Sequence, residues 1–454
     1  MSAAVQPLHR ADEKSWLDRG LSLFTDVRAG EGLTALLLAT NLFCLLGLYY
    51  VLKPVRDALI LSESGAVAQS YAAAGQALLL LVLVPAYGAI ASRLTRVRLI
   101  GIVTLFFASN LVVFYLLGIA GLRFGVAFYV WLGIFNLMVP AQLWAFANDL
   151  FSNERGKRLF PLVGLGASLG AWIGAEAASQ MFADLGPYRL MLVAATALVL
   201  CLFLTVWVDR RERGAGGEAG PVRAVAEQPL GKEGGFQLVL AQRYLLYIAL
   251  LVVVLNTVNT LGGFLLSSLV EVEAARAVQT GAAGSLGTAE WIGGFMGSFY
   301  ANVNLLGFLI QMFLVSRIFK YIGVRGALFV LPMVALASYS SLAFFPVLSI
   351  VRLAKTLENS TDYSIQNTAR HALFLPTSRE AKYKAKQAID SFFWRAGDLL
   401  QAVVVFVGVR LALGIRGYAA INLVFVAIWL VLVVAIAREH KKLVPVDIGE
   451  KAAA

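Results

Sequence analysis

The fold of this chain is decided by the stretch GLTALLLATNLFCLLGLYYVLKPVRDALI, residues 32–60. It is longer than the roughly 20 apolar residues with which an α-helix crosses a bilayer, yet Lys53, Arg56 and Asp57 interrupt it near its end. A charge at bilayer depth costs roughly 2.5–3.5 kcal/mol on insertion scales, so these side chains must face protein or a water-filled cavity. The stretch predicts a membrane-spanning helix that carries a binding site.

The same three charges also have a purely structural explanation. They could mark a helix end at the membrane surface, where Lys53 and Arg56 reach toward water and pair with Asp57. Pro54 and the apolar residues 58–61 favour a helix that continues instead. We therefore prefer the binding site and keep the helix end as the alternative.

The composition is that of a membrane protein. Of the 454 residues, 59% are hydrophobic and 14% are charged, and the mean hydropathy is +0.76, which is too apolar for a water-soluble surface. The net charge of +11 could indicate nucleic-acid binding, but the basic residues gather in alternate connections between apolar runs, as the positive-inside rule describes. We expect an all-α integral membrane protein whose partner is the lipid bilayer and not nucleic acid.

Twelve stretches are long and apolar enough to be transmembrane helices. The twelve candidate spans cover residues 32–60, 71–91, 97–119, 124–150, 158–182, 188–208, 243–270, 289–318, 325–344, 345–367, 385–413 and 417–437. Basic residues concentrate in the even-numbered connections, which places both termini in the cytoplasm. These basic residues are Arg93, Arg96, Arg98, Arg155, Lys157, Arg158, Arg317, Lys320, Arg325, Arg379, Lys382, Lys384 and Lys386.

A polar segment divides the spans six and six. Residues 209–235 are rich in Gly, Glu and Arg, which predicts a cytoplasmic linker between an N-terminal half, 1–208, and a C-terminal half, 236–454. Trp144 and Asn148 in the fourth span recur as Tyr363 and Asn367 in the tenth, at equal intervals. Two parallel six-helix halves are the architecture of major-facilitator transporters, which bind their substrates near the midplane between the halves.

Polar residues inside the spans mark a predicted cavity. The tenth span carries a stripe within about a third of the helix circumference, at 100° per residue. The stripe consists of Arg352, Lys355, Glu358, Asn359, Asp362 and Gln366. It indicates either a solute pathway or ion pairs that fix helix packing. Carboxylates within the spans are candidates for proton coupling, namely Glu176, Glu358 and Asp390, although for Glu176 we slightly favour a structural role as the partner of a nearby arginine.

Enzyme and cofactor motifs are missing from the sequence. There is no GxxxxGK[ST] loop and no nucleophile elbow, so we expect no enzyme activity. The three histidines, His9, His371 and His440, are too scattered for a metal site, and no cofactor is expected. The glycines 164, 166 and 170 mimic part of a dinucleotide motif, but no strand precedes them, which favours close helix packing.

Three groups of residues resemble a known family. The first is Leu52-Lys53-Pro54-Val55-Arg56-Asp57, where the family pattern is L-R-P-x-K-D. The second is Trp144 to Asn148 with Lys157 to Leu162, where the family patterns are F-W-x-F-A-N and K-R-F-Y-P-L. The third is Thr361 to Asp390, which matches the family pattern without a gap. On these motifs the chain resembles the ATP/ADP translocases, the nucleotide transporters of plastids and bacteria. The resemblance implies a twelve-span carrier of the bacterial inner membrane that exchanges nucleotides.

The resemblance also implies the substrate site. In the family a basic residue of the first span and a lysine of the tenth handle the substrate; here the first-span charges are Lys53 and Arg56 in exchanged order, and Asp362 replaces the lysine. An aspartate there would repel a polyphosphate, by about 1 kcal/mol at 4 Å in water and more at lower dielectric. The expected substrate-binding residues are Lys53, Arg56, Asp57, Asn148, Arg352, Lys355 and Asp362.

These features predict a secondary transporter of a small anionic organic solute, with nucleotides among the candidates and ATP/ADP-type antiport as one mechanism. The alternatives are a proton-coupled transporter of a non-nucleotide solute and a membrane scaffold that does not transport. The sequence leaves the substrate and the oligomeric state open.

Overall fold

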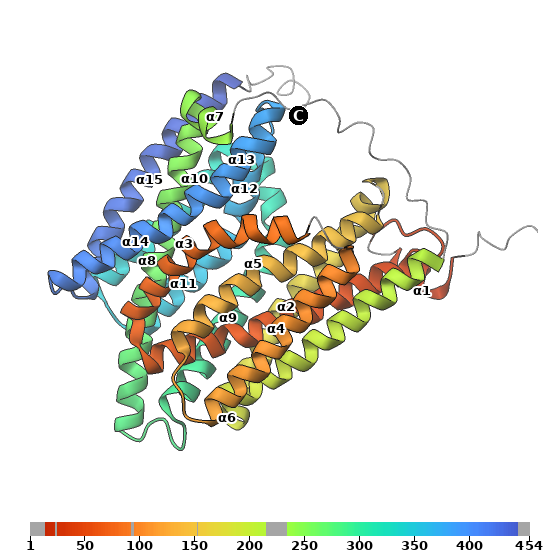
Figure 1. Ribbon diagram of the computed structural model, residues 1–454. Helices are drawn as coiled ribbons and strands as arrows, with labels where there is room; N and C mark the ends of the chain where they lie inside the picture. The colour runs from red at the N-terminus through yellow and green to blue at the C-terminus, as the bar shows by residue number, and fades with distance from the viewer. Residues whose placement is uncertain (1–13, 23–24, 92–94, 152, 215–233, 444–454) are drawn as a thin grey trace, which may run out of the picture.

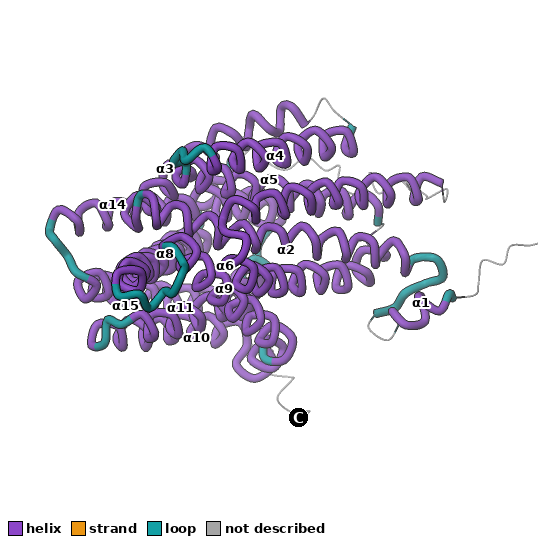
Figure 2. The backbone as a smooth tube through the Cα atoms, turned by 90° about the horizontal axis from the view of Figure 1, so that it is seen from below, coloured by secondary structure: helices purple, strands orange, loops and turns teal. Residues whose placement is uncertain are grey.

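The computed structural model describes residues 14–22, 25–91, 95–151, 153–214 and 234–443, and the regular structure within these ranges is helical (Figures 1 and 2). The helices are α1 (Trp16–Leu21), α2 (Gly32–Glu63), α3 (Gly65–Ala91), α4 (Arg96–Ile119), α5 (Gly125–Leu150), α6 (Asn153–Gly214), α7 (Gly235–Ala241), α8 (Arg243–Gln279), α9 (Thr288–Phe313), α10 (Val315–Phe344), α11 (Leu348–Thr361), α12 (Asn367–Ala372), α13 (Lys386–Ala388), α14 (Trp394–Arg410) and α15 (Ile415–Leu443). Three π-helical segments join some of them, η2 (Asp362–Gln366), η3 (Ala381–Ala385) and η4 (Ile389–Phe393).

Nine helices in the described part of the chain are long and apolar enough to cross a membrane, so an all-helical membrane protein is confirmed but a count of twelve is not. The predicted fifth and sixth spans lie in one helix, α6, which breaks at Gly186 (φ 64°). The predicted eighth span, α9, is not among the nine, and Asn302 and Asn304 lower its mean hydropathy. The predicted tenth span is interrupted by η2, which leaves α11 only 14 residues long.

Glycines bring α6 into close contact with α2. A Cβ atom on Gly166 would lie 2.3 Å from the carbonyl oxygen of Ala39, and one on Gly170 would lie 2.2 Å from that of Phe43. Only glycine permits such a backbone approach between membrane helices. The close packing expected of these glycines is therefore confirmed for Gly166 and Gly170, whereas Gly164 faces open space and does not take part.

The helices form two groups, which we call the first bundle (α1–α6) and the second bundle (α7–α15). Figure 1 shows them meeting at the lower left and spreading apart toward the ends that carry α1 and α7. Where they meet, α9 packs against α2 and α6, and α3 packs against α8 and α14. We call this the closed end; it includes the turn between α2 and α3 and the turn between α8 and α9.

Hydrogen bonds across the closed end tie the bundles together. The hydroxyl of Ser179 donates to the carbonyl oxygen of Gly294 (3.0 Å), and the backbone N–H of Ala66 donates to the Glu271 carboxylate (2.8 Å). Away from this end, a cleft of about 810 Å³ lies between α3–α5 of the first bundle and η4 and α14 of the second. The bundles are thus joined at one end and separated by a cleft toward the other.

An ion-pair cluster joins both ends of α6 to the start of α2. Arg158 donates two hydrogen bonds to the Glu31 carboxylate, each 3.0 Å, and Arg155 contacts both Glu31 (3.4 Å) and Glu212 (3.0 Å). Burial, the largest single influence, would raise the pKa of Glu31, but the hydrogen bonds from Arg158 and from the Arg28 N–H, together with the positive charges of Arg158 and Arg155, outweigh it and lower that pKa. Because the pKa of Glu31 is lower in the folded protein than in the unfolded chain, its ionised form stabilises the fold at pH values above the pKa of the unfolded chain. This stabilisation is lost as the pH falls through the pKa of the folded protein.

Glu31→Gln is therefore expected to lower the unfolding temperature at pH 7. Below about pH 4.3, the pKa of an unfolded glutamate, the unfolding temperature of the variant should fall less steeply with pH than that of wild type. Thermal unfolding of the purified protein at several pH values measures both effects. The matched control is Asp184→Asn, since Asp184 is an exposed carboxylate on the same long helix as Arg158. Equal pH dependence in Glu31→Gln and wild type would contradict the assigned role.

Candidate functional site

A cavity of about 250 Å³ lies where the two bundles meet, and we call it the central cavity. Side chains of both bundles line it, and most of them are polar or aromatic. Its lining includes Lys53, Arg56, Gln69, Tyr129, Asn259, Tyr300, Lys355, Asn359, Tyr363 and Gln401. Three cations from two helices of opposite bundles therefore face one cavity.

The charge cluster of α2 lies inside the protein and not at a helix end. Helix α2 continues past Pro54 to Glu63, Lys53 is 9% exposed and Asp57 is fully buried. The prediction of a continuing helix is confirmed. The alternative, a helix end at which Lys53 and Arg56 reach toward water, is not what the structure shows.

Arg56 is neutralised by its neighbour. Its guanidinium contacts the Asp57 carboxylate at 2.6 Å, and Tyr300 donates to the other Asp57 oxygen at 2.6 Å. Gln69 donates a further hydrogen bond to Asp57, 3.2 Å long. A buried carboxylate with this many donors is well satisfied, and it links α2 and α3 of the first bundle to α9 of the second.

Lys53 has a different environment. Its ammonium group lies 4.0 Å from the centre of the Tyr300 ring and 5.2 Å from that of Tyr50, which is cation–π geometry. No carboxylate of the described residues lies within 4.0 Å of it. A buried charge is normally paired, but among the described residues the Lys53 ammonium has no carboxylate in direct contact, so it is open to an anionic partner in the central cavity.

Lys355 enters the cavity from the second bundle as part of a buried network. Its ammonium contacts Glu358 at 3.1 Å and donates to the side-chain oxygen of Asn259 at 2.7 Å. Tyr339 donates to the other Glu358 oxygen at 2.6 Å. Glu358 was a candidate for proton coupling; in the structure its carboxylate is fully engaged in neutralising Lys355 and binding Tyr339.

Glu358→Gln is expected to reduce stability strongly, because breaking a buried ion pair on one side costs about 3–5 kcal/mol. The double variant Lys355→Met with Glu358→Met should recover much of the loss, since it removes both charges together. Thermal unfolding in detergent compares them. Glu176→Gln is the control, because Glu176 is exposed and accepts a hydrogen bond from Gln180 (2.8 Å). A destabilisation in the control as large as that in Glu358→Gln would contradict the network.

A second cavity of about 440 Å³ adjoins the central one, and we call it the second cavity. Asn259 and Tyr363 line both cavities. Asp362, which is 9% exposed, faces the second cavity and does not line the central one. Asp362 and Lys53, expected together in one substrate site, therefore lie in neighbouring compartments.

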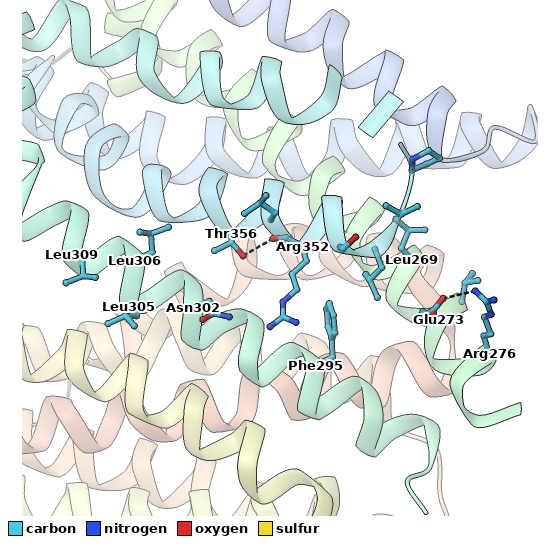
Figure 3. Close-up of a pocket in the computed structure, with 16 residues that line it drawn as sticks. Leu269, Glu273, Arg276, Phe295, Asn302, Leu305, Leu306, Leu309, Arg352 and Thr356 are labelled. Carbon is cyan, nitrogen blue, oxygen red and sulfur yellow. Dashed lines mark hydrogen bonds and ion pairs between the residues drawn. The ribbon is translucent and has the colours of Figure 1, made fainter. Parts of the chain in front are cut away.

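The other predicted residues lie elsewhere. Arg352 lines a groove between α8, α9 and α11 (Figure 3), where it stacks on Phe295 and donates to Ser298 at 2.9 Å. Asn148 is exposed on α5 and lines neither cavity. Asp390 pairs with Lys386 at 2.6 Å. The structure does not bring Arg352, Asn148, Glu176 or Asp390 together with Lys53.

The sequence alone did not single out several lining residues. Tyr300, Tyr129 and Gln69 contact the α2 charges, yet each is an uncharged residue outside the polar stripes and gives no distinct signal in the sequence. Arg370, in the second cavity, was hidden because it falls just beyond the predicted tenth span. The first gap comes from contacts between helices far apart in sequence, which periodicity along one helix cannot reveal, and the second comes from the position of a predicted span boundary.

The comparisons with known sequences give distant carrier proteins. No protein-family model matches the chain. It is 25% identical over 354 residues to "ADP,ATP carrier protein 1" of Chlamydia pneumoniae, covering 67% of this chain and 65% of that protein. It is 23% identical over 307 residues to the protein of the same name from Chlamydia muridarum, covering 60% and 56%. The chain thus spans a little over half to almost two thirds of the length of these relatives.

Solved structures share the fold. The nucleoside transporter NupG is 10% identical with a TM-score of 0.61, covering 90% of this chain and 99% of that one. A bacterial homologue of the iron transporter ferroportin, solved in an inward-facing state, is 14% identical with a TM-score of 0.60, covering 89% and 98%. The chain is a divergent relative of the ADP,ATP carrier proteins, built on the fold of major-facilitator transporters.

Proposed function

We propose that the protein is a secondary transporter of an anionic organic solute, which binds in the central cavity and crosses the membrane by alternating access. The observation that carries this proposal is Lys53, a buried cation without a carboxylate partner among the described residues, facing a cavity between two bundles. An anion would supply the missing countercharge and remove the cost of a lone buried charge. Tyr129, which lines the same cavity, offers a hydrogen-bonding hydroxyl.

The arrangement of the membrane helices follows from the same fold. We infer twelve spans in two six-helix halves, with α6 counted as two at Gly186 and with α9 and α11–α12 included. The positive-inside rule favours cytoplasmic termini in a bacterial inner membrane. The closed end would then face outward, and the cleft between the bundles would open to the cytoplasm, which is an inward-facing state.

The size of the cavity bears on the substrate. Ligand pockets commonly measure about 300–1,000 Å³, and the central cavity, at about 250 Å³, is smaller. A small anion fits this space; a nucleotide would have to extend past Asn259 and Tyr363 into the second cavity, where Asp362 opposes a polyphosphate. The names of the relatives keep ADP and ATP among the candidates, and the geometry favours smaller anions.

Uptake into proteoliposomes tests the proposal. Purified protein is reconstituted, and labelled ATP, ADP, orthophosphate, short alkyl phosphates and dicarboxylates are offered outside, with and without the same solute inside. We expect saturable uptake of at least one anion, with stimulation by internal solute if the mechanism is exchange. Protein-free liposomes are the control. Absence of protein-dependent flux for every anion would overturn the proposed function and favour a non-transporting membrane scaffold.

A further inference from the structure

The second cavity contains polar groups that lack partners. Gln366 is 1% exposed, and neither its amide nitrogen nor its amide oxygen has a hydrogen-bond partner. The Asp362 carboxylate, one turn earlier on η2, forms no ion pair within 4.0 Å with any residue that the structure describes. Buried polar groups in proteins are nearly always satisfied, so these two side chains indicate a missing hydrogen-bonding partner.

The partner must match the charges around it. Arg370 shares the second cavity, where its guanidinium stacks on Trp394 at 4.8 Å and donates to Asn367 at 3.4 Å. Arg56 and Lys355 have carboxylate partners, which leaves Lys53 and Arg370 positive and Asp362 negative in the two adjoining cavities. Together the two cavities therefore suit a solute with net negative charge that also carries one cationic group.

We propose that the second cavity binds the amino group of the transported solute, with Asp362 as its counterion and Gln366 as a further hydrogen-bond partner, while Lys53 holds the anionic group. The inference rests on the proposed function and narrows its substrate class to small amino-bearing organic anions. Such a solute extends from one cavity to the other past Asn259 and Tyr363, which line both cavities.

Arg370 shares the cavity but forms no ion pair with Asp362 within 4.0 Å, so a proton is the other species to consider for neutralising this carboxylate. A protonated Asp362 carboxyl has one O–H donor, which can serve at most one acceptor such as the Gln366 oxygen. An ammonium group has three donors and can bind the Asp362 carboxylate and the Gln366 oxygen together. The larger number of donors favours an amino group of the solute over a proton carried by Asp362.

A matched series of ligands tests this inference. The ω-aminoalkyl phosphates with chains of two to six carbons are compared with n-alkyl phosphates of the same lengths, which lack only the amino group. Varying the chain length scans the separation between the two cavities. Binding to the purified full-length protein is measured by thermal shift and titration calorimetry, for wild type, Asp362→Asn and the exposed control Asp184→Asn.

For wild type, at least one aminoalkyl phosphate is expected to bind about tenfold more tightly than its alkyl counterpart, since the amino group adds a charged hydrogen bond. Asp362→Asn should abolish that preference, and Asp184→Asn should keep it. Equal binding of the two series by wild type, an unchanged preference in Asp362→Asn, or no binding of any aminoalkyl phosphate would each overturn the inference. Anion flux in the uptake experiment would still stand in those cases, so failure here is distinguishable from failure of the proposed function.

Discussion

Replacing Lys53 with methionine is expected to weaken the binding of anions roughly ten- to a hundredfold, because a hydrogen bond to a charged group contributes about 1.5–3 kcal/mol. Methionine keeps the length and apolar stem of lysine and removes its charge. Lys53 has cation–π contacts and no carboxylate partner among the described residues, so its removal leaves no carboxylate unpaired. The fold should therefore tolerate the change while the affinity falls.

The measurement is a titration of the purified variant with the anion that binds wild type most tightly, together with its unfolding temperature without ligand. Lys320→Met is the matched control, since Lys320 is exposed on α10. Unaltered affinity in Lys53→Met would remove Lys53 from the binding site. A large loss of stability without ligand would show that Lys53 is structural.

Gly170→Ala is expected to destabilise the protein markedly. The new Cβ atom would lie 2.2 Å from the carbonyl oxygen of Phe43, so α2 and α6 would have to separate, and overpacking of this kind costs about 1–3 kcal/mol. Gly170→Leu should have a larger effect. Since α2 carries Lys53 and Arg56, we expect anion binding to weaken as well.

The control for this prediction is Gly164→Ala on the same helix, where the added Cβ atom has no neighbour within 4 Å. Alanine is a better helix former than glycine by about 1 kcal/mol, so this variant should be as stable as wild type or slightly more so. Thermal unfolding in one detergent compares the two. If both substitutions changed the unfolding temperature alike, the close contact between α2 and α6 would be refuted.

Hydropathy and local pattern predicted the framework well. The bounds of α2, α4 and α5 agree with the expected spans within a few residues, because a long apolar run has few alternatives to a membrane helix. The break of α6 at Gly186 was expected as a boundary between two spans. The break of the tenth span at η2 was not expected. A π-helical turn has a different hydrogen-bond pattern from an α-helix but no distinct amino-acid composition.

The candidate site was predicted only in part. The polar residues of the tenth span line three different spaces. Lys355 lines the central cavity, Asp362 lines the second cavity, and Arg352 lines the groove shown in Figure 3. A helical stripe defines a direction around one helix and not which neighbouring helix meets each turn. Only tertiary structure distinguishes paired charges, such as Glu358, from unpaired ones.

Flux through the central cavity provides the decisive measurement. Uptake of the best anion is followed in proteoliposomes that contain equal amounts of wild type, Lys53→Met or Lys320→Met. We predict saturable uptake by wild type and Lys320→Met, and for Lys53→Met a rate at subsaturating anion that is lower by about tenfold or more. Equal rates for all three proteins would contradict a transport site at Lys53.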